Sequence, residues 1–265
     1  MSPGLLWSLI YKDPLIILAT IVMGSISVIL SYFDPDGVLT DRVARLWART
    51  VLRIAGVRVR VRGREWIDPS TPYVFVGNHL SLMDTPVVLA HIPVRFLFLV
   101  NSKYVRLPFL GTHLRRCGHF SVQPDDVRAS LRIMTEAAEV IRRRGLSILV
   151  FPEGSRARGD MEPFKEGAAY IAIKAGVPVL PFALWGTREV LPIGSVHIRS
   201  GTVDLVFGPP IPTEGLALKD RTELTRRMQQ RVASLLPQLK FPRSVDAAVT
   251  TGNYGSLDQT RLQPQ

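Results

Sequence analysis

The residues with the clearest chemical potential lie in the segment Asn-His-Leu-Ser-Leu-Met-Asp at positions 78–84, directly after an apolar run at 73–76. On a regular helix His79 and Asp84 would point about 140° apart, so they can meet only if the chain bends between them. The end of a strand and the start of a helix would provide that bend, and Thr85-Pro86 favours a helix start. Asp84 would then accept the Nδ1 proton of His79 and leave Nε2 free as a general base.

The His79–Asp84 pair has no obvious nucleophile beside it, so we expect the attacking group to belong to a substrate. An alternative interpretation of the segment needs no chemistry. Asp84 would cap the following helix, and His79 would be a turn histidine with satisfied hydrogen bonds. Asn78 could brace the same turn or act as a cap. The segment alone leaves these interpretations open.

A second polar segment, Pro-Glu-Gly-Ser-Arg at 152–156, follows a run at 147–151 that has the apolar character of a buried strand. Gly154 would let the backbone approach a ligand, Ser155 offers a hydroxyl, and Arg156 carries a planar fork suited to phosphate. Because both polar segments follow apolar strands, we expect them to meet at one edge of an α/β sheet, where such sheets bind ligands.

Two further charged residues would complete an anion site. Glu153 is expected to pair with Arg156 and hold its guanidinium in position. Lys165 lies at the apparent start of the next helix, where backbone N–H groups also favour anions. The alternative is a surface turn with a solvated ion pair, which would contribute little to stability.

These segments resemble the lysophosphatidate acyltransferase family, the PlsC-like glycerolipid acyltransferases. The pattern Asn-His-x4-Asp at 78–84 looks like the catalytic block of that family, and Phe-Pro-Glu-Gly-Ser-Arg at 151–156 looks like its phosphate-binding block. The run Val-Pro-Val-Leu-Pro-Phe at 177–182, which contains Pro181, looks like its last block, a strand that shapes the acyl or acceptor pocket. The similarity extends from about residue 42 to residue 212, with the blocks in the family's order.

The resemblance implies a direct acyl transfer. His79 would deprotonate the free hydroxyl of 1-acyl-sn-glycerol-3-phosphate, and that oxygen would attack the thioester of acyl-CoA or acyl carrier protein to give phosphatidate. The residues implied for the acceptor phosphate are Glu153, Gly154, Ser155, Arg156 and Lys165. Backbone N–H groups near Gly154 or Asn78 are candidates for stabilising the oxyanion. We expect no cofactor and no metal, because a thioester is already an activated acyl donor.

One block departs from the family pattern. The family places an arginine, a few apolar residues after a glycine, where it helps to hold the phosphate. The matching stretch at 118–124 has Gln123 or the following proline in that place, and neither carries a charge. Arg115, Arg116 or Arg128 would have to substitute. Another lysophospholipid or a lyso-ornithine lipid therefore remains an alternative acceptor.

The composition agrees with an enzyme in a reducing compartment. A chain of 265 residues can hold one α/β domain and an appendage, and its single cysteine, Cys117, excludes an internal disulfide. Cys117 with His119 or His79 would be a rival Cys–His pair, which no surrounding motif supports. His91, His113, His119 and His197 lack the spacing of a metal site and receive no role.

The N-terminal part of the chain contains a membrane signal. Residues 15–33 carry no charge, and as a helix they would reach about 28 Å, close to the roughly 30 Å hydrocarbon thickness. Residues 1–40 are therefore predicted to form a membrane anchor that either crosses the bilayer or enters one leaflet. Four arginines between residues 42 and 53 follow it, against Lys12 before it. The positive-inside rule then predicts an inner-membrane protein whose catalytic domain faces the cytoplasm.

The net charge of +11 and the pI near 10.4 raise the possibility of nucleic-acid binding, but the arginines are arranged for a membrane. A helix predicted at 41–55 would carry Arg42, Arg45, Arg49 and Arg53 opposite Val43, Leu46, Trp47, Val51 and Leu52. Each basic residue near an anionic leaflet contributes about 1 kcal/mol. Zinc-finger spacings and RNP-type motifs are absent. We expect membrane phospholipids as partners, and no nucleic acid.

Strand patterns alternate with helical patterns along the rest of the chain. Strands are expected at 57–62, 73–76, 96–100, 120–122, 148–151, 179–184 and 203–207. The clearest helix runs from 125 or 126 to 144, with Gly145 as its stop, and another spans about 220–235. The alternation predicts an α/β domain over residues 41–242, with a mixed central sheet flanked by helices. The polar stretch 243–265 is predicted to be a disordered tail.

The sequence thus predicts a membrane-anchored acyltransferase of the lysophosphatidate type. Apart from the choice of acceptor, two alternatives stay open. A lipid hydrolase could use the same His79–Asp84 pair on water and would release free fatty acid without an acceptor. A non-catalytic basic membrane adaptor would bind membranes and show no turnover.

Overall fold

The computed structural model describes residues 8–106, 110–123 and 126–236. Within these residues the core is a seven-stranded sheet of order β1-β7-β6-β2-β5-β3-β4. Its strands are Val57–Arg62 (β1), Val74–Gly77 (β2), Phe96–Asn101 (β3), Phe120–Val122 (β4), Ser147–Val150 (β5), Val179–Trp185 (β6) and Gly201–Phe207 (β7). Neighbouring strands are parallel except for the antiparallel pair β6–β7. The predicted mixed sheet is confirmed, and every strand lies where the sequence predicted it, with small differences at the ends.

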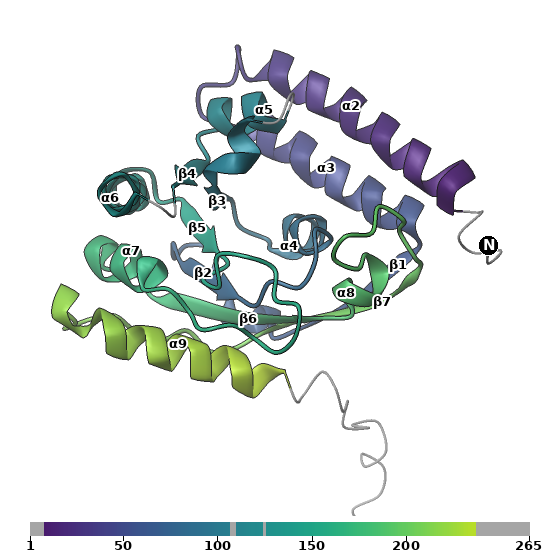
Figure 1. The fold of residues 1–265 in the computed structure, drawn as a ribbon. Coiled ribbons are helices and arrows are strands. Elements are labelled where there is room, and N and C mark those ends of the chain that lie inside the picture. The colour runs from purple at the N-terminus through teal and green to yellow at the C-terminus, as the bar shows by residue number, and fades with distance from the viewer. Residues whose placement is uncertain (1–7, 107–109, 124–125, 237–265) are drawn as a thin grey trace, which may run out of the picture.

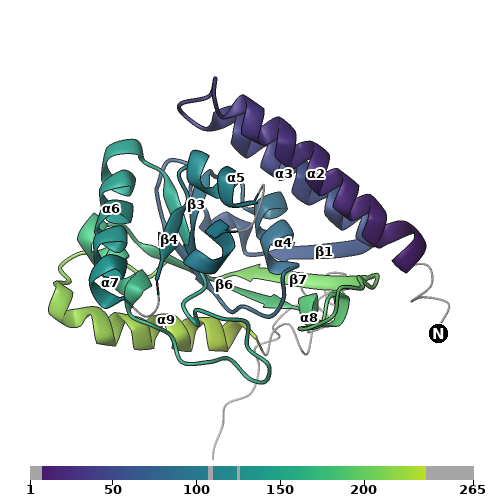
Figure 2. The same ribbon diagram turned by 45° about the horizontal axis from the view of Figure 1, so that its top comes forward.

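Helices cover both faces of the sheet, and one helix forms an outer layer (Figures 1 and 2). They are Asp13–Leu30 (α2), Val38–Ala55 (α3), Asp84–His91 (α4), Leu110–Arg116 (α5), Val127–Arg144 (α6), Gly167–Ala175 (α7), Thr187–Val190 (α8) and Arg221–Leu235 (α9). Short helical segments are Ser8–Lys12 (η1), Arg64–Trp66 (η2), Ser102–Arg106 (η3) and Leu218–Asp220 (η4). Helices α6, α7 and α9 pack on one face, α3 and α4 pack on the other, and α2 lies outside α3.

The two faces of the sheet explain why the strands look uniformly apolar in the sequence. In β2, Val74 and Val76 pack toward α6, α7 and α9, whereas Phe75 packs toward α3 and α4, and all three are fully buried. A parallel strand covered on both faces has no solvent side, so it shows no alternation of polar and apolar residues. The carboxyl ends of β2, β5 and β6 consequently share one edge, as expected for the two polar segments.

The predicted helix ends are largely correct. The side chain of Asp126 accepts a hydrogen bond from the Ala129 N–H and caps α6, and Gly145 ends the helix with a positive φ of 62°. Helix α3 begins at Val38, three residues before its predicted start. The carboxylate of Asp34 accepts from the N–H groups of Val38 and Thr40, so it fixes this earlier start.

Helix α2 is long and apolar enough, together with η1, to cross a membrane by length and composition, but it is tied to the domain along its length. Near its start, Lys12 Nζ donates to the carbonyl of Ala55 at the end of α3. In its middle, the Trp47 indole N–H donates to Thr20 Oγ1 at 3.0 Å. Helices α2 and α3 therefore form an antiparallel pair that packs on the sheet as one unit.

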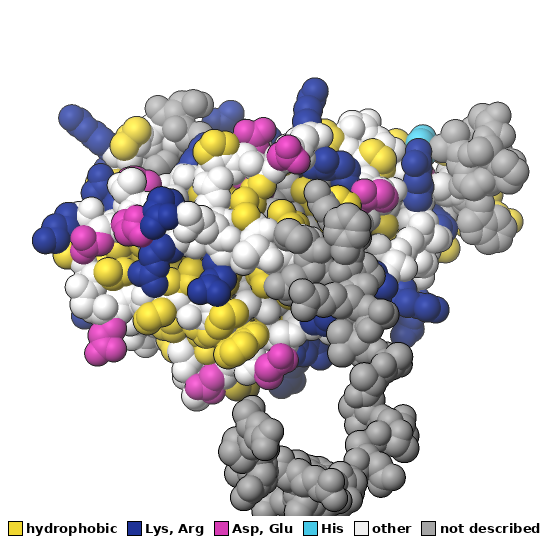
Figure 3. All heavy atoms as spheres, turned by 90° about the horizontal axis from the view of Figure 1, so that it is seen from below, with side chains coloured by type: hydrophobic (Ala, Val, Ile, Leu, Met, Phe, Trp, Pro, Cys, Tyr) yellow, Lys and Arg dark blue, Asp and Glu magenta, His cyan; other side chains and the backbone are white. Residues whose placement is uncertain are grey.

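The surface differs between the two sides of the molecule. On the side of α9, Lys and Arg are interspersed with Asp and Glu (Figure 3). On α2, large apolar side chains are exposed instead, including Ile17 at 59% and Ile29 at 60%. An exposed apolar face of this size marks an interaction surface.

The predicted basic face of α3 is wrong in one position. Arg45 turns inward, pairs with Asp41 at 2.7 Å, and donates to backbone carbonyl groups at the end of α4 and in the α4–β3 connection, including that of Val94. Its side chain is only 12% exposed, and Leu46, predicted to lie on the apolar side, is 53% exposed. Arg45 therefore fastens α3 to the core, because its planar fork can satisfy several carbonyls at once. Arg42, Arg49 and Arg53 remain exposed.

Two neutral and partly buried histidines lie close together, His113 on α5 and His119 just before β4. His113 Nδ1 lies 2.8 Å from Ser27 Oγ, and the N–H of Phe98 donates to His119 Nδ1 at 3.0 Å. The two rings are 5.8 Å apart. Burial lowers the pKa of both imidazoles, and that of His119 falls to about 3, with the neighbouring His113 adding to the shift. Both rings are neutral near pH 7.

We expect this burial to make folding sensitive to acid. His119 binds a proton less tightly in the folded chain than in the unfolded chain, so the unfolded state takes up more protons below about pH 6.5 and stability falls. From pH 7 to pH 5 the loss from His119 should be about 2 kcal/mol. Denaturant unfolding of the wild type and of His119→Asn at both pH values measures it. The variant should lose less stability than the wild type, and equal losses would contradict the assignment.

Candidate active site

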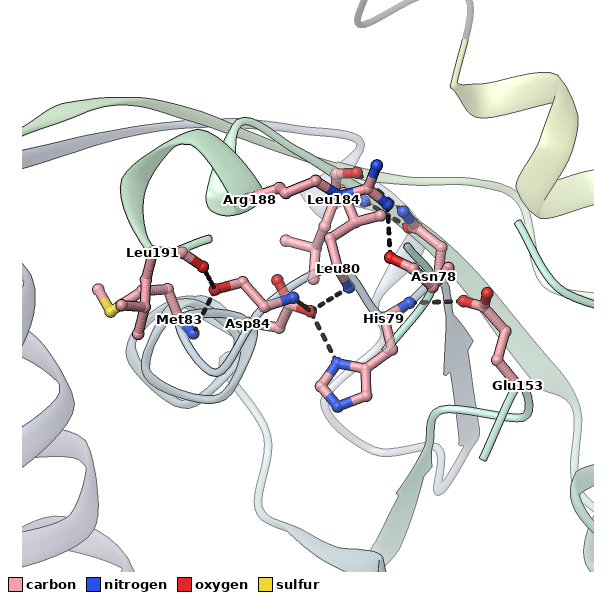
Figure 4. Close-up of polar contacts among 11 residues, drawn as sticks. Asn78, His79, Leu80, Met83, Asp84, Glu153, Leu184, Arg188 and Leu191 are labelled. Atoms are coloured by element: carbon pink, nitrogen blue, oxygen red, sulfur yellow. Dashed lines mark hydrogen bonds and ion pairs between the residues drawn. The ribbon is translucent and has the colours of Figure 1, made fainter. Parts of the chain in front are cut away.

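The turn between β2 and α4 brings His79 and Asp84 together, as the sequence predicted (Figure 4). Nδ1 of His79 lies 2.7 Å from Oδ2 of Asp84, and Asp84 is fully buried. The same Oδ2 accepts from the backbone N–H groups of Leu80 at 2.6 Å and Ser81 at 2.9 Å. An acceptor-only carboxylate oxygen at this distance fixes the proton of His79 on Nδ1 and leaves Nε2 as the unprotonated nitrogen.

The interpretation of Asp84 as a helix cap is wrong. Asp84 is the first residue of α4, the preceding Met83 is the N-cap, and no side chain makes a cap hydrogen bond there. The carboxylate points back to the turn before the helix rather than forward to helical N–H groups. Its position at the N-terminus of α4 favours negative charge.

Two polar side chains brace this turn, one against β6, as Figure 4 shows for Asn78, and one against the end of α8. Asn78 donates to the carbonyl of Leu184 at 3.0 Å and accepts from its N–H at 2.8 Å, so its amide continues the pairing of β2 with β6. Ser81 Oγ donates to the carbonyl of Leu191 at 2.7 Å. Asn78 braces the strand end, one of the two roles that the sequence left open.

The imidazole of His79 stands at the wall of a cavity rather than in packed core. Its ring stacks on Phe151 with centroids 4.2 Å apart, and the side chain is 16% exposed. No residue of the described chain binds its Nε2. The cavity has a volume of about 1210 Å³, and apolar side chains predominate in its wall. Gly154, Ser155, Arg156 and Lys165 line the same cavity.

The predicted ion pair between Glu153 and Arg156 is wrong. Glu153 is buried, and its two oxygens accept from the backbone N–H groups of His79 and Glu162, each at 2.7 Å. Burial raises the pKa of the Glu153 carboxyl, and the two N–H bonds oppose that rise. The side chain of Glu153 therefore links its own segment to the backbone of the His79 turn. In the described chain no residue pairs with the guanidinium of Arg156.

The backbone around Gly154 suits an anion. Gly154 has a positive φ of 75°, and a Cβ at this position would lie 2.8 Å from Lys165 Nζ, so the ammonium group lies directly over the glycine. The Gly154 N–H donates to the carbonyl of Phe151 and is not free to stabilise an oxyanion, so the predicted donors near Gly154 are narrowed to its neighbours. The N–H groups of Ser155 and Arg156 have no acceptor in the described chain and remain candidates for that role.

Arg188 is a positioning residue that the sequence analysis missed. Its Nη2 donates to the carbonyls of Ala157 at 2.7 Å and Gly159 at 2.9 Å. The N–H of Ala157 in turn donates to the carbonyl of His79 at 2.9 Å. Arg188 thus holds the loop after Arg156 against the His79 turn. Its only signal in the sequence is a Gly-Thr-Arg step after the β6 strand.

The predicted role of Pro181 in shaping a pocket is wrong. Pro181 is buried in β6, where it pairs in register with Val76 of β2, and none of the described residues 177–182 lines the cavity. The strand contributes indirectly, since its residue Leu184 holds Asn78.

The arginine missing from the family pattern is not replaced by the predicted neighbours. Arg115 donates to the carbonyl of Val105, and Arg116 donates to Ser31 Oγ beside α2. Neither they nor Arg128 line the cavity, whereas Arg158 does. Among the basic residues of the cavity wall, Arg158 is the one closest in sequence to Arg156, and it could supply the missing positive charge.

The rival Cys–His pair is not formed as predicted. Cys117 Sγ lies 3.4 Å from His113 Nδ1, no hydrogen bond joins it to His119 or His79 in the described chain, and burial raises the pKa of the thiol. A buried thiol with a raised pKa is a poor nucleophile. In the described residues, no group of three or more His, Cys, Asp or Glu side chains could hold a metal ion.

Similarity to known proteins agrees with this geometry. Residues 58–185 match the family model described as Acyltransferase. The chain is 28% identical over 199 residues to 1-acyl-sn-glycerol-3-phosphate acyltransferase alpha of Homo sapiens, an alignment that covers 75% of this chain and 70% of that protein. It is 30% identical over 234 residues to a 1-acyl-sn-glycerol-3-phosphate acyltransferase of Chlamydomonas reinhardtii. That alignment covers 87% of this chain and 68% of that protein.

A solved structure shares the fold. The crystal structure of the 1-acyl-sn-glycerophosphate acyltransferase PlsC from Thermotoga maritima superposes with a TM-score of 0.74 and 27% identity, covering 89% of this chain and 96% of that one. The chain therefore belongs to the 1-acyl-sn-glycerol-3-phosphate acyltransferase family.

Proposed function

We propose that this protein transfers an acyl chain from acyl-CoA or acyl carrier protein to the free hydroxyl of 1-acyl-sn-glycerol-3-phosphate, with His79 as general base. The observation that carries this proposal is the free Nε2 of His79 in the same cavity wall as Arg156 and Lys165. A base and an anion site in one cavity can hold an anionic lipid with its hydroxyl at the imidazole.

The transfer would proceed in two proton steps. Nε2 of His79 takes the proton of the acceptor hydroxyl as the oxygen attacks the thioester carbonyl carbon. The C–S bond then breaks, and the imidazolium returns its proton to the departing thiolate. Asp84 holds the tautomer and stabilises the imidazolium. General-base assistance of this kind contributes about 10²–10⁴-fold to the rate.

The acceptor phosphate would bind at Gly154–Lys165. The free N–H groups of Ser155 and Arg156, the guanidinium of Arg156 and the ammonium of Lys165 are all donors, and Arg158 adds a cation at the same wall. Charge-assisted hydrogen bonds are the strongest that proteins make to phosphate. No step of this mechanism needs a cofactor.

The exposed face of α2 would attach the enzyme to the cytoplasmic side of a membrane. Helix α3 runs beside α2 and exposes Arg42, Arg49 and Arg53. If α2 crossed the bilayer, these arginines would be carried toward the hydrocarbon, which is costly. An orientation of α2 in the plane of the interface buries its apolar face and leaves the arginines among the lipid headgroups.

Replacing His79 by alanine should lower the kcat of acyl transfer by about 10²–10⁴-fold, because the general base is lost. Membrane association should not change. The assay follows thiol release from oleoyl-CoA in the presence of 1-acyl-sn-glycerol-3-phosphate, with phosphatidate identified by mass spectrometry. His91→Ala removes an imidazole that does not line the cavity and serves as the control. Substantial turnover by His79→Ala would refute the base assignment.

Replacing Arg156 by alanine should lower kcat/KM for the acceptor by about 10–100-fold, the loss expected for a charged hydrogen bond. The KM for acyl-CoA should stay nearly constant. The measurement varies each substrate at saturating concentrations of the other. Arg142→Ala, an exposed arginine at the end of α6, is the control. An effect confined to the donor would place the phosphate elsewhere.

Placing glutamates on α2 should weaken membrane binding. In the double variant Ile17→Glu, Ile29→Glu, two exposed side chains become charged, and binding to phosphatidylglycerol vesicles should fall about tenfold or more. The matched control, Gln230→Glu with Ala233→Glu, adds the same charge at exposed positions of α9. Vesicle sedimentation compares the two. Equal binding by both variants would mean that α2 does not meet the membrane.

A further inference from the structure

A polar cluster interrupts the apolar wall of the cavity away from the His79 turn. The cluster consists of Ser27 of α2, Thr40 of α3, His113 of α5, Cys117, and His119 just before β4, and all of them line the cavity. Apolar side chains of α2, β3 and α6 surround it in the same wall. The proposed mechanism uses none of these residues, so their chemistry needs a separate explanation.

His119 presents a permanent hydrogen-bond donor. Its Nδ1 accepts the Phe98 N–H, so the proton of the neutral ring is on Nε2. The ring stays neutral at any physiological pH, since its pKa lies at about 3. In the described chain no acceptor binds this Nε2–H, and the atom is not sealed within protein. A donor in apolar surroundings costs free energy unless an acceptor meets it.

His113 offers a second nitrogen beside the first. Its Nδ1 is occupied by Ser27 Oγ at 2.8 Å and Cys117 Sγ at 3.4 Å, and its Nε2 has no partner in the described part of the chain. The rings of His113 and His119 are 5.8 Å apart. A hydroxyl group both donates and accepts, so it can bind His119 Nε2–H together with either tautomer of His113.

The register of the sheet places this pair far from the reacting centre. Phe75 of β2 and Phe98 of β3 both pair with Leu149 of β5, so two strand spacings separate them. His79 lies four residues beyond Phe75 along the chain. The usual strand spacing and the rise per residue then give a separation of roughly 15 Å between His79 and Phe98. His119 binds Phe98. A ligand group at His119 therefore belongs to the middle or end of a chain whose carboxyl carbon is at His79.

We propose that His113 and His119 form a binding site for a hydroxyl group carried within an acyl chain, and that the enzyme favours chains oxygenated at that depth. The site deepens the proposed function and rests on it, since the chain must enter the cavity that holds His79. The chain could belong to the thioester donor or to the lysolipid acceptor, and both present the same chemistry to the two imidazoles.

The test compares purified full-length enzyme on octadecanoyl-CoA and on its 3-hydroxy, 12-hydroxy and 18-hydroxy forms, with unsubstituted 1-acyl-sn-glycerol-3-phosphate as acceptor. A second arm places the 12-hydroxyoctadecanoyl chain on the acceptor instead. In one of the two arms we expect the kcat/KM for the 12- or 18-hydroxy chain to be about threefold to tenfold higher than the kcat/KM for the unsubstituted chain. One hydrogen bond provides a ratio of this size. The 3-hydroxy chain should gain nothing.

Two variants of His119 separate binding from folding. Asparagine keeps an acceptor in the place of Nδ1 for the Phe98 N–H but lacks the ε position. Glutamine keeps an N–H donor at the ε position. His119→Asn should bring the ratio of kcat/KM between the hydroxylated and the unsubstituted chain to about one, and His119→Gln should retain part of the preference.

The outcomes distinguish the two proposals. No turnover of any thioester would contradict the proposed function. Turnover of unsubstituted chains with no preference for a hydroxylated chain in either arm would overturn only the hydroxyl site. A preference that survives in His119→Asn would likewise overturn it.

Discussion

The carboxylate of Asp84 has no access to solvent, and its Oδ2 accepts three N–H groups from residues 79–81. A buried carboxylate is costly unless hydrogen bonds compensate it, so the turn must close around this oxygen for the fold to be stable. The same closure fixes which nitrogen of His79 carries the proton. The stability of the turn and the tautomer that the proposed mechanism requires of His79 therefore have one physical cause.

The rest of the site is built outward from this turn. Glu153 accepts from the His79 N–H, and Ala157 donates to the His79 carbonyl, so both ends of the loop 154–156 are bonded to the backbone of His79. Arg188 fastens the far part of that loop. Because each of these links ends on a backbone group of the turn or of the loop, they fix the separation between His79 and residues 154–156. Fixed separation is what positioning of two substrates requires.

The sequence was sufficient for the sheet, the major helices and the His79–Asp84 contact, since each depends on local pattern: apolar runs, a capping aspartate, a proline after the turn. The sequence did not predict the hydrogen-bond partners of side chains whose partners are distant in the sequence. Glu153 was expected to bind its neighbour Arg156 and instead binds two backbone N–H groups. Arg45 was expected on a solvated helix face and instead donates to carbonyls at the end of α4 and in the α4–β3 connection. Tertiary packing determines the partners of both side chains, and the local spacing of residues does not predict that packing.

Helix α2 joins two properties that the sequence suggested were separate. Its outward side exposes Ile17 and Ile29, while its inward side contributes Thr20 and Ser27 to the cavity wall. An anchor that served only for attachment could be exchanged for any apolar helix of similar length. Here the contacts of Thr20 with Trp47 and of Ser27 with His113 fix its rotation and its register on α3 and α5. The helix proposed to meet the membrane therefore also forms part of the cavity wall, so a change on its inner side alters the cavity even when the apolar outer face is untouched.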